Sequence, residues 1–141
     1  MSASRILDGA ALAEGDTVLD IGTGDGELTF EAHERIGDGW VIAVDPSVDA
    51  LEELLRRAHE RDAGGIMYLV GDAGVLPLPD ESVDVALSRV PAEAGELARV
   101  LRPGGRVSLC GSFDPDAFAG WADVETSVDD SGQVYLTARR T

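Results

Sequence analysis

Hydrophobic positions along the chain form two alternating kinds of segment. Short, continuous apolar runs alternate with longer stretches in which apolar residues recur every three or four positions. The continuous runs predict buried strands, and the longer stretches predict amphipathic helices. Strands are predicted at 17–22, 40–45, 66–71, 82–88 and 106–110. Helices are predicted at 26–37, from Ser47 to just before Gly64, at about 92–101 and near 115–120.

The second predicted helix has the clearest local signals. Ser47 is a suitable N-cap, and Asp49 lies where the positive end of the helix dipole favours an acid. On the outer face, glutamates and arginines four residues apart predict ion pairs, Glu52–Arg56 and Glu53–Arg57. The apolar stripe that is predicted to face the sheet consists of Val48, Leu51, Leu54, Leu55 and Ala58.

The alternation of strands and helices predicts a doubly wound α/β fold. Strands that are apolar on both faces are typical of a parallel sheet covered by helices, and right-handed crossovers are the default. The end of the chain differs, because "ADVETSV" and "QVYLTARR" flank "DDSG" and predict an antiparallel hairpin. In such sheets a ligand binds beyond the carboxyl ends of the strands.

The charge balance is strongly acidic, with 27 acidic against 11 basic residues and a net charge of −16. Every basic residue is arginine, and lysine is absent. Self-repulsion on this scale destabilises a compact domain unless salt screens it. We therefore expect a source with a saline cytoplasm; an ordinary acidic protein from a GC-rich genome is the alternative. Nucleic acid is a disfavoured partner, because its backbone requires basic patches.

Other features favour a cytoplasmic protein that forms one domain over 1–141. No apolar run approaches the roughly 18 residues of a membrane span, and the N-terminus is too weakly apolar for a signal peptide. The single cysteine, Cys110, cannot form an internal disulfide and is expected to be buried. No metal site is predicted, and His33 and His59 are expected on outer helices away from the strand ends.

Candidate chemistry is concentrated in "VLDIGTGDGELTF", residues 18–30. Three glycines follow the first strand and lead into a helix N-terminus, a setting that binds anionic groups. Asp45 ends the next strand, where a carboxylate can accept hydrogen bonds from both hydroxyls of a ribose. A dinucleotide and S-adenosylmethionine both fit this pattern. Glu27 occupies the place of the third glycine of a dinucleotide fingerprint, which disfavours the dinucleotide.

Four segments in order resemble class I S-adenosylmethionine-dependent methyltransferases, mostly the small-molecule subgroup that includes quinone-biosynthesis enzymes. These segments are "VLDIGTGDG", "VIAVDPS", "YLVGDAGVLPLPDESVDVALS" and "LRPGGRV". The resemblance covers about residues 12–111. It implies the strand order 3-2-1-4-5-7-6 with the seventh strand antiparallel, and S-adenosylmethionine as the cofactor.

The resemblance also implies contacts for the methionine part of the cofactor. Asp20 would orient the amino group, directly or through water. The backbone from Gly22 through Thr23 and Gly24 to Gly26 would line the methionine and the ribose. Ser88 and Arg89 would flank the methionine and the acceptor. A rival explanation for Asp20 is that it satisfies backbone groups near the turn.

For the adenosine part, the resemblance implies a second set of contacts. Asp45 would bind the ribose hydroxyls, with Pro46 and Ser47 close to the adenine. Asp72 would accept from the adenine amino group, and Ala73 would offer its backbone N–H. Asp72 also lies in "GDAG", so a role as a turn residue alone is the rival explanation.

The acceptor site is the least determined part of the sequence. Only about sixteen residues precede the first predicted strand, a minimal N-terminal cap, and no catalytic residue stands out. The first hypothesis is a methyltransferase for a small molecule, with a homodimer or a partner chain covering the pocket. The alternatives are a methyltransferase for a protein or another macromolecule, and a non-catalytic cofactor-binding subunit.

Overall fold

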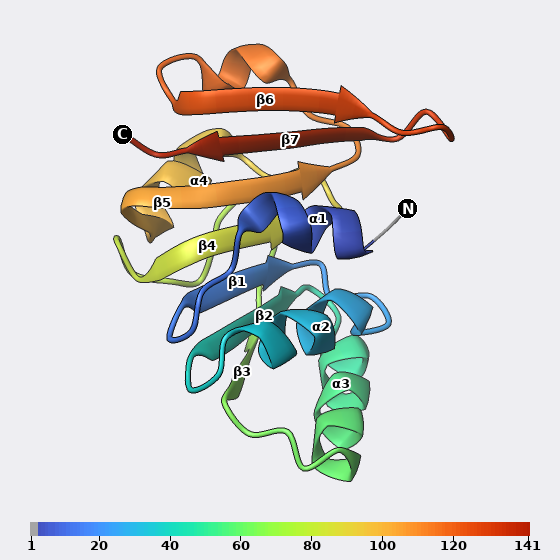
Figure 1. Ribbon diagram of the computed structural model, residues 1–141. Helices are drawn as coiled ribbons and strands as arrows, with labels where there is room; N and C mark the ends of the chain where they lie inside the picture. The colour runs from blue at the N-terminus through green and yellow to red at the C-terminus, as the bar shows by residue number, and fades with distance from the viewer. Residues whose placement is uncertain (1–2) are drawn as a thin grey trace.

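The computed structural model describes residues 3–141, which form one seven-stranded sheet flanked by helices (Figure 1). The helices are α1 (Ala3–Ala10), α2 (Glu27–Arg35), α3 (Val48–Glu60), α4 (Ala94–Val100) and the short 3₁₀ helix η1 (Pro115–Phe118). The strands are β1 (Thr17–Ile21), β2 (Trp40–Asp45), β3 (Ile66–Val70), β4 (Val83–Ser88), β5 (Leu101–Cys110), β6 (Ala122–Val128) and β7 (Val134–Arg139).

The strand order is β3-β2-β1-β4-β5-β7-β6, which confirms the predicted order and the doubly wound class. Strands β1 to β5 pair in parallel, whereas β7 is antiparallel to both β5 and β6. The predicted C-terminal hairpin is therefore present at one edge. The order reverses between β1 and β4, and this switch point places a crevice at the carboxyl ends of those strands.

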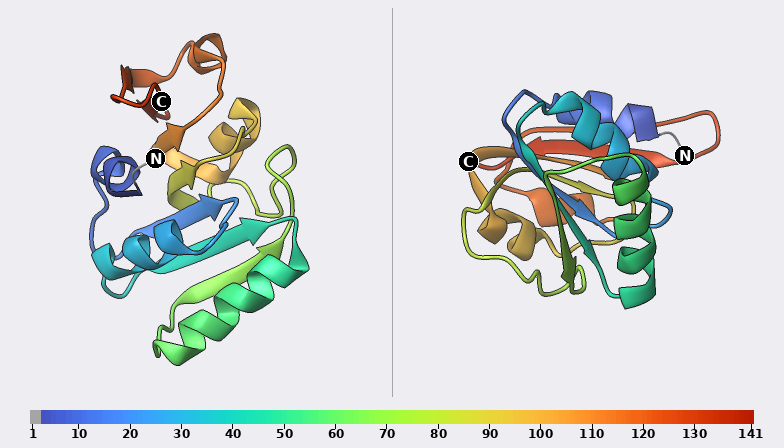
Figure 2. Two further views of the ribbon diagram at one scale, coloured as in Figure 1. Left: turned by 90° about the vertical axis from the view of Figure 1, so that its right-hand side faces the viewer. Right: turned by 90° about the horizontal axis from the view of Figure 1, so that it is seen from below.

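Helices α1, α2 and α3 lie on one face of the sheet, and α4 with η1 lies on the other (Figure 2). Successive strand residues alternate between the two cores. Val18 and Val41 belong to the core beneath α1–α3, whereas Leu19 and Ile42 belong to the opposite core. Both faces of the central strands are therefore buried, as the continuous apolar runs predicted.

Helix α1 was not predicted, although it closes one end of the first core. Its buried residues are Ala3, Ile6, Leu7 and Ala10, spaced as one helical face. A hydrogen bond also joins the backbone of α1 to the sheet, because Ser108 Oγ of β5 donates to the carbonyl of Ile6 at 2.6 Å. The segment before β1 is thus packed structure and forms part of the domain core.

Helix α3 confirms the N-cap prediction, since Ser47 Oγ accepts from the backbone N–H of Ala50 at 3.1 Å. The predicted apolar stripe was too wide, because Val48 and Leu55 are about half exposed. The predicted ion pairs four residues apart were wrong. Arg56 instead pairs with Glu53 and Glu60, since its guanidinium reaches one turn in each direction.

Helix α4 ends at Val100 and β5 begins directly at Leu101, so the segment "LRPGG" is the start of a strand that was predicted to begin only at 106. Two backbone hydrogen bonds join the first part of β5 to the residue after β7. Gly104 N donates to the carbonyl of Arg140, and Arg140 N donates to the carbonyl of Gly105. A register shift between Val83 and Val85 absorbs the extra residues.

Candidate cofactor site

A cavity of about 340 Å³ lies at the carboxyl ends of β1, β2, β3 and β4, at the switch point of the sheet. Five of the predicted cofactor residues line it: Gly22, Asp45, Pro46, Asp72 and Ala73. The remaining lining residues are Ile21, Val44, Gly71, Val90 and Pro91. The fold thus brings together residues from the ends of four separate strands, in one mostly apolar cavity with two acids.

The glycine turn between β1 and α2 has a left-handed backbone at Gly22, Gly24 and Gly26, with φ of 73°, 54° and 84°. Gly26 forms the N-cap of α2 without any side chain, and a Cβ there would lie 2.6 Å from Leu54 Cδ1. Gly22 N donates to the carbonyl of Val44 at 2.8 Å, which anchors the turn to β2. Conformation and close packing together require glycine in this turn.

Asp45 connects the glycine turn to the start of α3. One carboxylate oxygen accepts from Thr23 N at 3.0 Å and from Thr23 Oγ1 at 3.4 Å, and the other accepts from Ser47 N at 2.9 Å. The residue is 9% exposed. Ser47 has its hydroxyl engaged in capping α3, so any contact from Ser47 to a ligand would be additional to the cap.

Asp72 forms a turn and also lines the cavity. Its Oδ1 accepts from Gly74 N at 2.7 Å and from Val75 N at 3.0 Å, which leaves Oδ2 outside these bonds. The carbonyl of Ala73 accepts from Glu93 N at 3.2 Å and ties this loop to the start of α4. The turn role that rivalled ligand binding is therefore present, and it positions the carboxylate at the cavity wall.

Asp20 is fully buried, and its surroundings are unusual for a carboxylate. Thr29 Oγ1 donates to Oδ2 at 2.5 Å, whereas Oδ1 has no partner. Burial raises the pKa of Asp20 to about 6, the hydroxyl of Thr29 and the charge of Arg89 oppose the rise, and Asp45 adds to it. Asp20 therefore retains a buried acceptor with no hydrogen-bond donor.

Arg89 carries the matching unsatisfied donor. Within residues 3–141, the buried side-chain atoms without a hydrogen-bond partner are Asp20 Oδ1 and Arg89 Nη2. The nearest ion-pair contact of Arg89 is weak, with Nη2 4.0 Å from Oε2 of Glu27. One acceptor and one donor of opposite charge are thus left open beside the glycine turn, on the α2 side of the sheet.

Ser88 and Val90 shape the turn after β4. The Ser88 hydroxyl donates to the carbonyl of Val90 at 2.6 Å and accepts from Val90 N at 3.1 Å, so this hydroxyl is occupied within the turn. The turn carries Val90 over the glycine loop, where its methyl groups would lie 3.0 Å from a Cβ at Gly22.

Sequence reasoning missed Thr29, Val90 and Pro91. The position of Val90 and Pro91 directly after a predicted strand was an available signal. Thr29 offered a weaker one, a hydroxyl on the buried stripe of a helix that begins at the turn.

The cysteine, the histidines and the possible metal ligands outside the cavity are the candidates for a second site. Among residues 3–141, no group of three His, Cys, Asp or Glu side chains could hold a metal ion. Cys110 is buried as predicted, and burial raises the pKa of its thiol. His33 Nε2 lies 2.6 Å from the carbonyl of Gly64, a local structural contact. No helix in the described part of the chain is long and apolar enough to cross a membrane.

The fold and cavity define a Rossmann-like domain with a ligand site at the switch point. A family model described as "Methyltransferase domain" matches residues 18–105, which is more than half of the chain. The chain therefore belongs to the methyltransferase domain family, within the class I S-adenosylmethionine-dependent methyltransferases. This confirms the family and the cofactor that the four sequence segments implied.

Relatives and solved structures agree with this assignment. An arsenite methyltransferase of Halobacterium salinarum is 34% identical over 86% of the chain, and the match spans 36% of that relative. A methyltransferase structure from Aquifex aeolicus superposes with a TM-score of 0.80 at 20% identity, over 99% of the chain and 90% of that structure. Geranyl diphosphate methyltransferase in complex with S-adenosylmethionine gives 0.81 at 19% identity, over 99% and 84%.

Proposed function

We propose that this domain binds S-adenosylmethionine at the switch point and transfers its methyl group to a small-molecule acceptor. The observation that carries the proposal is the pair of unsatisfied buried atoms, Asp20 Oδ1 and Arg89 Nη2. An acceptor and a donor of opposite charge fit the two charged groups of an amino acid. The methionine part of the cofactor supplies both, an ammonium and a carboxylate.

The methionine end of the cofactor would reach these atoms past the glycine turn. Asp20 Oδ1 would accept from the ammonium, and Arg89 Nη2 would donate to the carboxylate, which makes both hydrogen bonds charge-assisted. Since an unsatisfied buried polar group is costly, the ligand would remove a cost that the free protein carries. Thr29 would keep the Asp20 carboxylate oriented through its 2.5 Å hydrogen bond.

The adenosine end would occupy the 340 Å³ cavity. Asp45 lies at the end of β2, where backbone donors hold both of its oxygens, and its remaining lone pairs would accept from the ribose hydroxyls. Asp72 Oδ2 would accept from the adenine amino group, and Val90 and Pro91 would form an apolar wall against the ring. Pro46, from the β2–α3 connection, would close the opposite side.

Methyl transfer needs position more than it needs acid–base groups. The bound cofactor supplies an electrophilic methyl on a sulfonium, and the chain contributes orientation and exclusion of water. Arg89 and Asp20 would fix one end, and Asp45 the other, so that the sulfur lies between them over the glycine turn. No catalytic base is assigned in this proposal, because an acceptor that is already nucleophilic needs none.

Ligand-dependent thermal stability tests the proposal. At 100 times its dissociation constant, S-adenosylmethionine or S-adenosylhomocysteine should add about 2.7 kcal/mol to the free energy of unfolding, whereas NAD should add nothing. Melting curves with each ligand, followed by circular dichroism, measure this. Stabilisation by NAD alone, or by none of the three, would contradict the proposal. Transfer of label from methyl-labelled cofactor to a cell extract of small molecules then tests catalysis.

The acceptor in this proposal is a small molecule, because several relatives are named for reactions on small molecules. The first of these acts on arsenite and another in ubiquinone and menaquinone biosynthesis. The chain spans 36% and 46% of the lengths of two of the relatives that it matches, so the activity of the whole protein is part of the proposal. We also propose that 1–141 acts as one cofactor-binding domain, with α1 as its minimal N-terminal cap.

We further propose a cytoplasm of high salt as the setting of this protein. The net charge of −16 supports this, as does similarity to a protein of Halobacterium salinarum. Raising KCl from 0.1 M to 2 M should increase the midpoint of thermal unfolding, because screening removes self-repulsion. The control is 2 M sucrose, which favours compact states without screening charge. A midpoint that is equal at both KCl concentrations would overturn the proposal.

A further inference from the structure

A second hollow, of about 550 Å³, lies next to the cofactor cavity. It is formed by the segments that follow β4 and β5, and it shares Pro91 with the cofactor cavity. The segments that follow the carboxyl ends of the neighbouring parallel strands β4 and β5 therefore lie side by side in this hollow. The lining residues are Pro91, Ala92, Glu93, Ala94, Ser112, Phe113, Asp114, Ala117 and Phe118.

The floor of this hollow is apolar and attached to the core. Phe118 is 2% exposed, and Phe113, Ala92 and Ala94 pack against the core on the α4 side of the sheet. The ring of Trp121 supports Phe118 edge to face, with centroids 5.2 Å apart. Phe113 and several small residues, backed by the buried ring of Phe118, therefore offer an apolar surface that can cover one face of a ring-shaped ligand.

The charged groups of the hollow have one sign. Glu93 and Asp114 are its ionisable side chains, and no arginine or histidine lines it. Both acids are fixed in place: Glu93 Oε2 accepts from Glu96 N at 2.8 Å, and Asp114 Oδ1 accepts from Asp116 N at 3.0 Å. An anionic ligand would find no cationic partner here and would meet two like charges, in addition to losing hydration on the apolar floor.

We infer that this hollow is the acceptor site, and that it takes an uncharged, largely apolar ring compound, to the exclusion of carboxylates and phosphates. The inference rests on the proposed function. The hollow adjoins the cofactor cavity at Pro91. It also approaches Arg89, which is proposed to hold the methionine end, because a Cβ at Gly111, next to Ser112 of the hollow, would lie 3.4 Å from the carbonyl oxygen of Arg89. Trivalent arsenic does not fit this site: arsenic(III) is held by several thiolates, and the single cysteine of these 141 residues, Cys110, is buried against Gln133.

Calorimetric titration of the protein saturated with S-adenosylhomocysteine tests the inference. The two probes have the same ring system, 2-naphthol without charge and 2-naphthoate with one negative charge. We expect 2-naphthol to bind at least about 10-fold more tightly, at the lowest KCl concentration that keeps the protein folded. Equal affinities, or tighter binding of the naphthoate, would overturn the inference.

Two variants locate the binding in the hollow. Phe113→Ala should weaken the binding of 2-naphthol about 5-fold or more. Val124→Ala should not change it, because Val124 is an exposed apolar residue of β6 that does not line the hollow. Ala117→Arg, which places a cation in the lining, should remove most of the discrimination against 2-naphthoate. An unchanged preference in the arginine variant would contradict the assignment of the hollow.

The design separates this inference from the proposed function. If S-adenosylhomocysteine stabilises the protein but 2-naphthol does not bind, the acceptor inference fails and the cofactor proposal stands. If S-adenosylhomocysteine itself does not bind, the proposed function fails first.

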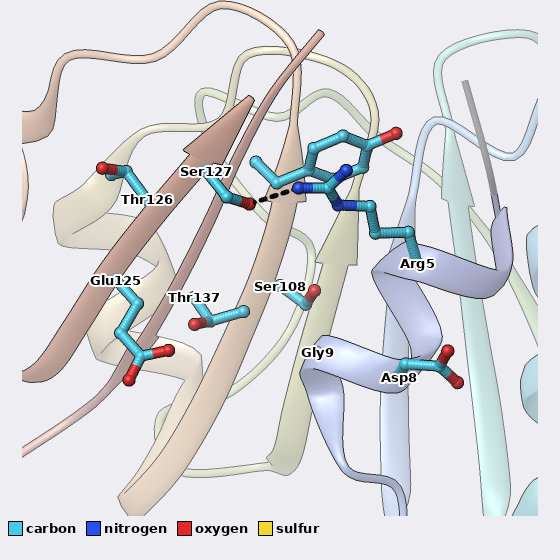
Figure 3. A pocket seen from close by; sticks show the side chains of 9 residues that line it. Arg5, Asp8, Gly9, Ser108, Glu125, Thr126, Ser127 and Thr137 are labelled. Atoms are coloured by element: carbon cyan, nitrogen blue, oxygen red, sulfur yellow. Dashed lines mark hydrogen bonds between the residues drawn. The ribbon is translucent and has the colours of Figure 1, made fainter. Parts of the chain in front are cut away.

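A polar hollow of about 500 Å³ between α1 and the β5–β7–β6 edge is a weaker candidate for a ligand site. Figure 3 shows Arg5 extending across it from α1 to Ser127. Arg5 Nη2 donates to Ser127 Oγ at 2.7 Å, and the guanidinium carbon lies 4.3 Å from the centre of the Tyr135 ring. The hydroxyl of Ser108, which also lines it, donates to the carbonyl of Ile6. The contacts in this hollow join α1 to the C-terminal hairpin, and we assign it no ligand.

Discussion

Replacing Asp20 with asparagine should stabilise the ligand-free protein while it impairs cofactor binding. At pH 8 we expect the free energy of unfolding to rise by up to about 3 kcal/mol. The reason is that burial raises the pKa of Asp20 from 3.8 to about 6, and each unit corresponds to about 1.4 kcal/mol of penalty on the ionised form. Asparagine removes the buried charge and keeps an oxygen that can accept from Thr29.

The same shift sets the pH dependence of the wild-type protein. Between pH 4 and 6 the unfolded chain has already lost the proton of Asp20, whereas the folded chain retains it. Protons bound to the folded state are therefore in excess, so this contribution to stability falls as the pH rises and levels off above about pH 7. Urea unfolding at pH 5 and pH 8 should show this fall in the wild type and a smaller one in Asp20→Asn.

Asp20→Asn should weaken cofactor binding although it stabilises the ligand-free protein. The asparagine cannot offer a charge to the ammonium, so the affinity for S-adenosylmethionine should fall at least about 10-fold. Asp38→Asn, at an exposed acid after α2, is the matched control and should change neither quantity appreciably. A destabilised Asp20→Asn protein that binds the cofactor normally would show that Asp20 is a purely structural residue.

The sheet and its topology could be predicted because the apolar runs and the glycine turn agreed with the tertiary structure. Strands that are buried on both faces are apolar throughout, and glycine is required where the backbone is left-handed, as at Gly26. These signals depend on residues close together in the sequence. Helix α1 escaped prediction because its apolar face, including Ile6 and Leu7, is short.

The burial and the hydrogen bonding of each site residue could not be predicted from the sequence, because they depend on the folded structure around that residue. Asp20 Oδ1 and Arg89 Nη2, which are sixty-nine positions apart, are both without a hydrogen-bond partner in the folded chain, although the charge of Arg89 acts on Asp20. The hydroxyls of Ser47 and Ser88 are occupied by local turns, which a motif does not reveal. The hollow that we assign to the acceptor forms only when the segments after β4 and β5 come together.

Asp45→Ala should weaken the binding of S-adenosylmethionine by at least about 100-fold. Two losses add: the ribose loses its acceptor, and the glycine turn loses the carboxylate that holds Thr23 N, Thr23 Oγ1 and Ser47 N. Unsatisfied groups of this kind each cost about 1–3 kcal/mol. Equilibrium dialysis with labelled cofactor measures the affinity, and Asp49→Ala, at a nearby exposed acid in the first turn of α3, is the control with the same change of charge.

A second ligand separates the two losses at Asp45. A 2′,3′-dideoxy analogue of S-adenosylhomocysteine lacks the hydroxyls that Asp45 is proposed to bind, but it has the same adenine and amino acid ends. The wild type should bind this analogue at least about 10-fold more weakly than S-adenosylhomocysteine, whereas Asp45→Ala should bind both with similar affinity. If Asp45→Ala discriminates as strongly as the wild type does, Asp45 acts only by holding the turn. In that case the ribose is recognised elsewhere in the cavity, since Asp45 would be a positioning residue for Thr23 and the start of α3.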